Sequence, residues 1–221
     1  MILTLTSLSV SLSHIASFFI QAKFNNQQCL KYAISDCTLV DTLTGIDSQP
    51  YLAFQGSIIN EECLLADCRQ KNMNNEIDAI LTNRFIAAFW MGDYYKANEY
   101  YDLASEQPTF ALPKIKLISV TYYRGLISFQ LFRAGKGDDW LAEGKKMLEK
   151  MELWVKNCNK DVYENKLYLL QAENYASDDQ IVAAKESYEL STTSSRDHGL
   201  IHEQGLAAGK SALVLFYHVH M

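Results

Sequence analysis

The side chains with the best spacing for chemistry are two histidines and a glutamate near the C-terminal end. His198 and His202 are four residues apart, and Glu203 follows directly. On one helix, residues i and i+4 lie on the same face, so the two imidazoles could share a metal ion such as zinc. No third ligand stands at a fixed spacing from them. We predict no metal site, and we keep a metal-binding or enzymatic helical protein that uses His198, His202 and Glu203 as the alternative hypothesis.

Residues 205–211 (GLAAGKS) are similar to a phosphate-binding P-loop. A P-loop follows a buried strand and has four residues between its glycines, because successive backbone N–H groups must wrap around the phosphate. Here three residues separate the glycines, and the preceding residues are polar. Leu206, Lys210 and Leu213 continue a helical period through the segment. The pattern therefore favours a helix in which the two glycines allow an adjacent helix to cross closely.

No other group of residues has the arrangement of a nucleophile with its base, so we predict no catalytic residue and no cofactor. The five cysteines include no Cys-x-x-Cys pair. Most of them stand at apolar helical positions, where a cysteine behaves as a small hydrophobic residue. This usage predicts a reducing compartment, and we expect the chain to be cytoplasmic. The cysteines are Cys29, Cys37, Cys63, Cys68 and Cys158.

The charge balance and the N-terminal segment limit the possible partners. A net charge of −6 and a pI near 5.4 disfavour a nucleic-acid partner, since phosphate binding depends on clusters of Lys and Arg. Residues 1–20 carry no formal charge, so a secreted helical protein with a cleaved signal peptide is a further alternative. The segment lacks a basic start, and Ser and Thr interrupt its apolar residues. We expect an ordinary helix there and no membrane span.

Apolar residues recur at helical spacing along most of the chain, which has only three prolines and ten glycines. The sequence therefore predicts an all-α fold, with antiparallel helical hairpins stacked as a tetratricopeptide-like solenoid. We divide it into N-terminal helices at 1–44, a helical-repeat region at 45–217 and a tail at 218–221. Within the repeat region the expected helices are 51–69, 76–91, 94–108, 113–132, 140–155, one over residues 167–175, one over 184–191, and 200–215.

The clearest hairpin joins the helix at 76–91 to the next helix through a turn at Gly92. In that second helix, Ala97, Tyr101 and Ala104 are spaced to share one face. Small residues at such positions let two helices approach, and an aromatic side chain fills the space between them. Similar spacing returns at Gly144 and at Ala184, where the latter is followed by Tyr188 and Ser191. Hairpins of this kind cannot bury their apolar faces alone, so they stack on neighbours.

Three motifs in the C-terminal third carry a family resemblance. They are Leu169-Leu170-Gln171-Ala172-Glu173, the pair Ala184 and Tyr188, and His198-Gly199-Leu200-Ile201-His202-Glu203. From about residue 154 onward the chain resembles the helical-repeat segment of very large signalling proteins. Those proteins combine a protein-kinase-like domain, a P-loop ATPase, a tetratricopeptide-like region, GAF domains and a histidine kinase. None of the family's catalytic motifs lies in this sequence.

The resemblance implies a regulatory role between catalytic modules, and no catalytic residue carries over. We therefore expect a non-catalytic helical-repeat scaffold for protein–protein or interdomain interaction. It would be a fragment or a relative of a multidomain signal-transduction kinase or ATPase. The expected partner is another protein or a neighbouring domain of the same polypeptide.

Overall fold

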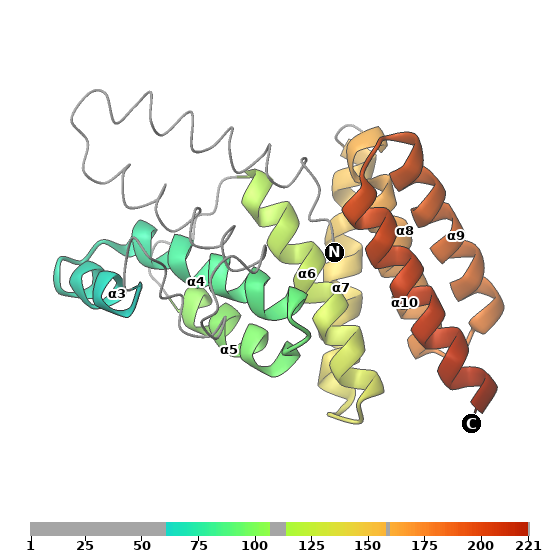
Figure 1. Cartoon of the computed structure of the whole chain (residues 1–221), viewed down its shortest axis with the longest axis horizontal. Helices are drawn as coiled ribbons and strands as arrows, with labels where there is room; N and C mark the ends of the chain where they lie inside the picture. Colours follow the sequence, from blue (N-terminus) through green and yellow to red (C-terminus); the bar gives the residue numbers. More distant parts are fainter. Residues whose placement is uncertain (1–60, 107–113, 158–159, 221) are drawn as a thin grey trace. The chain divides into compact units, whose positions relative to one another are not determined.

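A computed structural model describes residues 61–106, 114–157 and 160–220 (Figure 1). Within these ranges the chain forms eight α-helices and no strand, so the all-α prediction is confirmed for this part of it. The helices expected before residue 61 lie outside the described residues. In the described ranges no helix is both long enough and apolar enough to cross a membrane.

The chain divides into two compact units, Met1–Pro113 and Lys114–Met221, and the boundary falls inside the predicted repeat region. In the first unit, α3 (Glu61–Gln70) packs on α4 (Asn74–Trp90), and α4 forms a hairpin with α5 (Tyr94–Ser105). Gly92 makes the turn with a φ of +79°, which suits glycine. The Asp93 carboxylate then accepts the backbone N–H of Lys96 at 3.0 Å and caps α5.

The buried face of α5 is centred one residue away from its predicted position. Ala97 and Ala104 are buried as expected, but the buried aromatic side chain is Tyr100. Tyr101 is half-buried, and its ring centre lies 5.8 Å from that of Phe85 on α4. A position three residues after Ala97 and four before Ala104 lies between them on the helix surface, which explains the burial of Tyr100.

The cysteines of α3 differ from each other in exposure. Cys68 is fully buried, as expected for a cysteine that acts as a small hydrophobic residue. Cys63, which the helical pattern also placed inward, is exposed. The remaining cysteines lie outside the described residues. The core prediction is therefore correct for one of the two cysteines that the structure describes.

The second unit contains α6 (Lys114–Arg133), α7 (Asp138–Asn157), α8 (Lys160–Ser177), α9 (Ile181–Asp197) and α10 (Ile201–His220). Helices α6 and α7 form one hairpin, and α8 and α9 form the next. Helix α8 packs on both α7 and α6, and α10 packs on α9 with a smaller contact to α8. Residues 218–220, predicted as a tail, continue α10 as helix.

Two glycines of the second unit lie in close contact with side chains of neighbouring helices. A Cβ atom on Gly144 of α7 would come within 2.7 Å of the Phe129 ring on α6. A Cβ atom on Gly125 of α6 would come equally close to Leu170 of α8. On α9, the spaced residues Ala184, Tyr188 and Ser191 are all buried, as predicted. Gly125 and Gly144 therefore each receive a large side chain from a neighbouring helix.

Candidate functional site

The two histidines that the alternative hypothesis assigned to a metal ion do not share a helix. His198 follows the end of α9, Gly199 turns the chain with a φ of +69°, and His202 lies in the first turn of α10. The Nδ1 atom of His198 is 2.8 Å from the backbone oxygen of Ser194. The two imidazoles therefore do not share one helical face, and the arrangement that the alternative hypothesis needs is not present. Among the described residues, no three His, Cys, Asp or Glu side chains are positioned to hold a metal ion.

Glu203, the third residue of that motif, points into the second unit and binds neighbouring side chains. Lys166 and Asn165, both on α8, donate hydrogen bonds to its two carboxylate oxygens. The Nε2 atom of His202 lies 3.6 Å from Oε1 of Glu203. Asn165 also donates to the hydroxyl of Ser195 on α9 at 3.2 Å. We call these five residues the Glu203 cluster, and together they join α8, α9 and α10.

Glu203 is ionised at neutral pH although it is buried. Burial alone would raise the pKa of this carboxyl, because the charged form loses its hydration. The adjacent His202 imidazole and the charge and hydrogen bond of Lys166 outweigh that effect and lower the pKa to about 2. The carboxylate is therefore a stable partner for cations and a poor general acid or base near pH 7.

A second polar cluster surrounds Glu173, which is 0% exposed. Arg133 of α6 binds its carboxylate with a distance of 2.5 Å between Nη2 and Oε2. The hydroxyl of Tyr188 on α9 donates to Oε1 at 2.6 Å. The ammonium of Lys210 on α10 lies 4.0 Å from Oε2 and donates to Gln130 of α6 at 3.2 Å. We call these five residues the Glu173 cluster, and they come from α6, α8, α9 and α10.

The charges of the Glu173 cluster stabilise one another. Burial would raise the pKa of Glu173, but the nearby charges of Lys210 and Arg133 and the hydrogen bonds of Arg133 and Tyr188 lower it. Burial, reinforced by the negative charge of Glu173, raises the pKa of the Tyr188 hydroxyl. That hydroxyl therefore stays protonated and remains a donor. The cluster fixes the relative positions of four helices, which is the best-supported role of its residues.

The glycine-rich segment at 205–211 lies in the middle of α10 and is helical throughout. Its lysine, Lys210, is only 5% exposed and belongs to the Glu173 cluster. The prediction of a helix in place of a P-loop is confirmed. The prediction that the two glycines mark a close helix crossing is wrong. Gly205 and Gly209 are exposed, and an added Cβ atom on either would meet no described atom within 4 Å.

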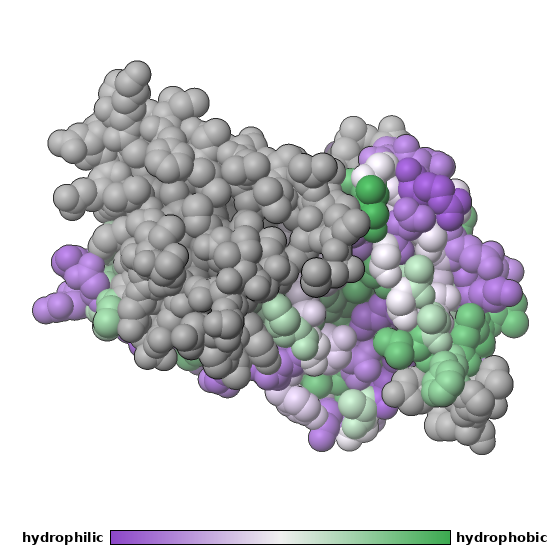
Figure 2. Space-filling view, viewed as in Figure 1, coloured by the Kyte–Doolittle hydropathy of each residue, from purple (hydrophilic) through white to green (hydrophobic). Residues whose placement is uncertain are grey.

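Large apolar side chains remain exposed on the last two helices. Leu213 is 54% exposed and Phe216 is 60% exposed, both on α10. Leu190 and Val182 of α9 are also more than half exposed. Figure 2 shows apolar surface over the C-terminal half of α10, at the lower right of the view. Contiguous exposed apolar surface of this kind is typical of sites that contact other macromolecules.

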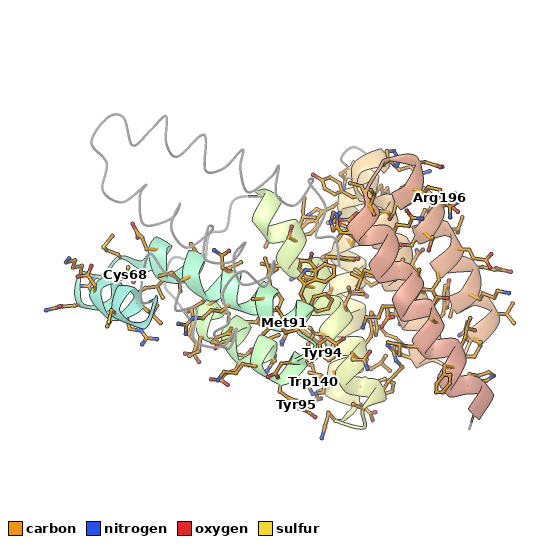
Figure 3. The ribbon with its side chains drawn as sticks, in the orientation of Figure 1. Cys68, Met91, Tyr94, Tyr95, Trp140 and Arg196 are labelled. Carbon is orange, nitrogen blue, oxygen red and sulfur yellow. The ribbon has the colours of Figure 1, made fainter. Side chains whose placement is uncertain are left out.

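The first unit has a smaller exposed apolar area at the turn between α4 and α5 (Figure 3). Met91 and Tyr95 are exposed, while Tyr94 is half-buried with its ring 5.9 Å from that of Phe89. Tyr95 carries its aromatic ring at the start of α5. These side chains flank the glycine turn.

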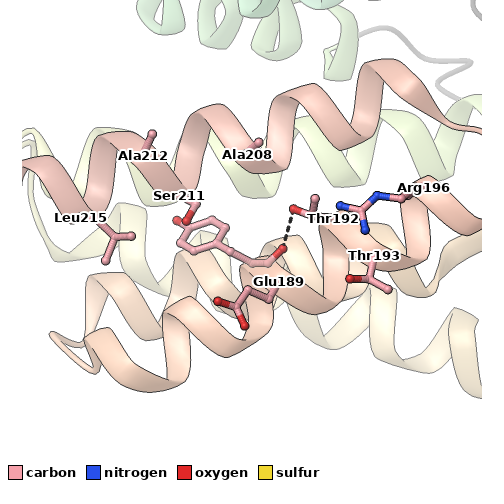
Figure 4. Close-up of a pocket in the computed structure, with 9 residues that line it drawn as sticks. Glu189, Thr192, Thr193, Arg196, Ala208, Ser211, Ala212 and Leu215 are labelled. Carbon is pink, nitrogen blue, oxygen red and sulfur yellow. Dashed lines mark hydrogen bonds between the residues drawn. The ribbon is translucent and has the colours of Figure 1, made fainter.

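A shallow groove of about 400 Å³ runs between α9 and α10 (Figure 4). Its α10 wall is apolar or weakly polar, and its α9 wall carries two threonines, Glu189 and Arg196. The hydroxyl of Thr192 already donates to the backbone oxygen of Tyr188 at 2.8 Å. The groove is therefore better suited to packing against a side chain than to hydrogen bonding with a polar ligand. It is lined by Tyr188, Glu189, Thr192, Thr193, Arg196, Ala208, Ser211, Ala212 and Leu215.

Asp78 on α4 is a buried carboxylate of the first unit, and its surroundings differ from those of Glu173 and Glu203. It is 4% exposed, and its Oδ1 atom accepts no hydrogen bond among the described residues. Burial raises its pKa to about 6. Every residue of α4 from Glu76 to Phe85 is buried, so this helix is enclosed on all sides. A carboxyl in this position loses hydration, and no described residue provides a cation that compensates for the loss.

Comparison with known proteins adds no relative. The chain matches no protein-family model, no curated protein and no solved structure. The resemblance to multidomain signalling proteins therefore rests on the sequence motifs alone and stays a prediction.

The two polar clusters could not be found from sequence spacing, because their members are far apart in the chain. Arg133 and Glu173 are 40 residues apart, and Lys166 and Glu203 are 37 apart. One signal was present in the sequence. Glu173 and Lys210 both fall in phase with apolar helical positions, where a charged residue is buried only if it has a partner.

Proposed function

We propose that this chain is a non-catalytic helical-repeat scaffold that binds another protein or a neighbouring domain. One observation carries the proposal. The buried charged groups of the second unit bind one another across helices, while large apolar side chains of α9 and α10 face solvent. Polar groups committed to interhelical contacts favour a structural role, and exposed apolar surface favours a binding role.

The order of helix contacts supports a tetratricopeptide-like stack. Helix α10 packs on α9 and α8 in the same way that α8 packs on α7 and α6. Stacked repeats produce this relation, because the first helix of each hairpin covers both helices of the hairpin before it. Glycines with positive φ at Gly92 and Gly135 stand between paired helices.

The proposed setting follows from the sequence resemblance. We place the scaffold next to catalytic modules of a multidomain signal-transduction kinase or ATPase, as a fragment or a relative of one. The cysteine usage supports a cytoplasmic location for it. In this setting the chain would transmit or maintain an arrangement of domains through contact alone.

The test is a search for direct protein contacts in the source cells. The tagged chain is cross-linked in vivo, and cross-linked peptides are identified by mass spectrometry. The proposal predicts cross-links from α9 and α10 to a specific protein, to another domain of the same polypeptide, or to a second copy. Contacts that stay at background level would contradict it. So would stoichiometric binding of ATP or zinc by the purified chain, because a scaffold needs neither.

A further inference from the structure

One face of α10 is exposed, apolar and free of charged groups along about three turns. Its residues follow the spacing i, i+3, i+4, i+7, i+8 and i+11, so they share one side of the helix. All six are exposed. The face spans about 16 Å at 1.5 Å per residue. We call it the α10 stripe, and it consists of Gly205, Ala208, Gly209, Ala212, Leu213 and Phe216.

The glycines of the stripe differ from the other helical glycines of this unit. Gly125 and Gly144 each receive a large side chain from a neighbouring helix, at distances that leave no room for a Cβ atom. Gly205 and Gly209 meet nothing within 4 Å among the described residues. Glycine lowers helix stability, so two exposed glycines in one helix carry a cost that local structure does not offset. An incoming helix that seats large side chains on them would offset it.

The stripe is complementary to itself. Two antiparallel copies of α10 related by a two-fold axis between positions 210 and 211 place each small residue opposite a larger one. Gly205 faces the partner's Phe216, and Ala208 faces the partner's Leu213. The remaining pair, Gly209 and the partner's Ala212, lies nearest the axis and permits close approach. A two-fold interface requires this kind of self-complementary surface.

We propose that the α10 stripe binds the α10 stripe of a second copy of this chain in an antiparallel, two-fold dimer. This rests on the proposed scaffold function and names one of its partners. The pairing places no like charges together, because the stripe carries none. The groove between α9 and α10 widens the contact, since Ala208 and Ala212 belong to both surfaces.

The interface is small, so the dimer is reversible. A single pair of short helices buries less surface than a standard stable protein–protein interface, even with the adjoining groove. We therefore expect association in the micromolar range, seen as a mass that rises with concentration.

Sedimentation equilibrium on the full chain tests the interface. The wild type should pass from monomer to dimer between about 1 and 200 μM. Phe216→Glu and Leu213→Glu should each weaken dimerisation at least about tenfold, because they bury a carboxylate. Leu190→Glu on α9 is the matched control, with similar exposure outside the stripe. It should leave the dimer unchanged, and circular dichroism should show all three variants folded.

The Gly209→Leu variant distinguishes a specific fit between two α10 stripes from non-specific apolar association. The substitution adds apolar surface at an exposed position, where an added Cβ atom meets no described atom within 4 Å. If the copies associate through any apolar contact, the variant should dimerise more strongly than the wild type. The proposed packing predicts weaker association, because a leucine near the two-fold axis forces the helices apart.

Disulfide trapping tests the antiparallel register. Gly205→Cys and Phe216→Cys chains should form a mixed disulfide when combined and oxidised, above the background of the native cysteines in the wild type. Neither variant alone should do so through the new cysteine. Its two copies would stand about 16 Å apart along the axis, too far for a disulfide. Disulfides within one variant instead would overturn the antiparallel arrangement.

The outcomes also separate this inference from the proposed function. A wild-type chain that stays monomeric at about 200 μM overturns the dimer. If the same chain forms specific cross-links to a different protein, the scaffold function stands without the dimer. If it forms none, both fail. A dimer that Leu213→Glu and Phe216→Glu leave intact uses another surface and also overturns the inference.

Discussion

Buried carboxylates in the two units have opposite environments. In the second unit, Glu173 and Glu203 each lie against cations and hydrogen-bond donors, which lower their pKa values. In the first unit, Asp78 is buried to a similar degree, but its pKa is raised to about 6 because burial acts alone. The difference shows that burial does not decide whether a carboxylate stabilises a fold. The neighbouring cations and donors decide it.

The largest expected effect is the loss of the Glu173 charge. Glu173→Gln keeps the shape of the side chain but leaves Arg133 and Lys210 without their shared counter-charge. We expect a loss of about 3–5 kcal/mol in the free energy of unfolding, measured by urea denaturation. Glu189→Gln is the control, because Glu189 is an exposed glutamate on α9. A loss below about 1 kcal/mol for Glu173→Gln would contradict the structural role of the cluster.

The Glu203 cluster should give a stability that depends on acid pH. The folded pKa of Glu203 is about 2, below its ordinary value of 4.5, so its contribution is present above about pH 4.5. It is lost as the pH falls toward 2. The gap between wild type and Glu203→Gln should therefore reach about 3 kcal/mol at neutral pH and close between pH 4.5 and 2. A gap that does not change with pH would show that the ion pair contributes nothing.

Asp78 should give the opposite dependence. Its folded pKa of about 6 lies above its ordinary value of 3.8, so the contribution of Asp78 to stability is most favourable below pH 3.8 and is lost as the pH rises through 6. Asp78→Asn removes the charge and should stabilise the chain by about 1–2 kcal/mol at pH 7.5. Thermal unfolding at several pH values measures this. The gain should vanish below about pH 4, and destabilisation at pH 7.5 would indicate a cation beside Asp78.

The smallest expected effect is the difference in stability between two Gly→Ala variants, one at an exposed glycine and one at a glycine that contacts a neighbouring helix. Gly205→Ala should stabilise the monomer by about 1 kcal/mol, because alanine favours helix and the added Cβ meets open space. Gly125→Ala should destabilise it, since the Cβ would come within 2.7 Å of Leu170. Thermal unfolding of dilute protein compares the two. Equal effects would mean that Gly125 is not a contact position.

Local spacing predicted the helices well. Ala184, Tyr188 and Ser191 form the buried face of α9, and the Gly92 turn separates α4 from α5 as expected. These features depend on residues that are close in sequence, where helical periodicity is informative. The helix expected from residue 76 begins two residues earlier, at Asn74. Helix boundaries are less certain than helix existence, because capping depends on a few local bonds.

Contacts between distant segments could not be predicted. The pairing of Arg133 with Glu173 depends on how α6 and α8 pack, which no short motif encodes. The same limit explains the error at Gly205 and Gly209. A glycine pair in a helix indicates an approach surface, but the sequence does not tell whether that surface is filled within the chain. In this fold it faces outward.

The central claim is that this chain acts by contact and that the α10 stripe is a fitted binding surface. Sedimentation equilibrium of wild type against Gly209→Leu tests it most directly. We predict a concentration-dependent dimer for the wild type and an association at least about tenfold weaker for Gly209→Leu, although the variant is more apolar and more helical. A monomeric wild type, or a Gly209→Leu chain that associates as strongly or more strongly, would contradict the account.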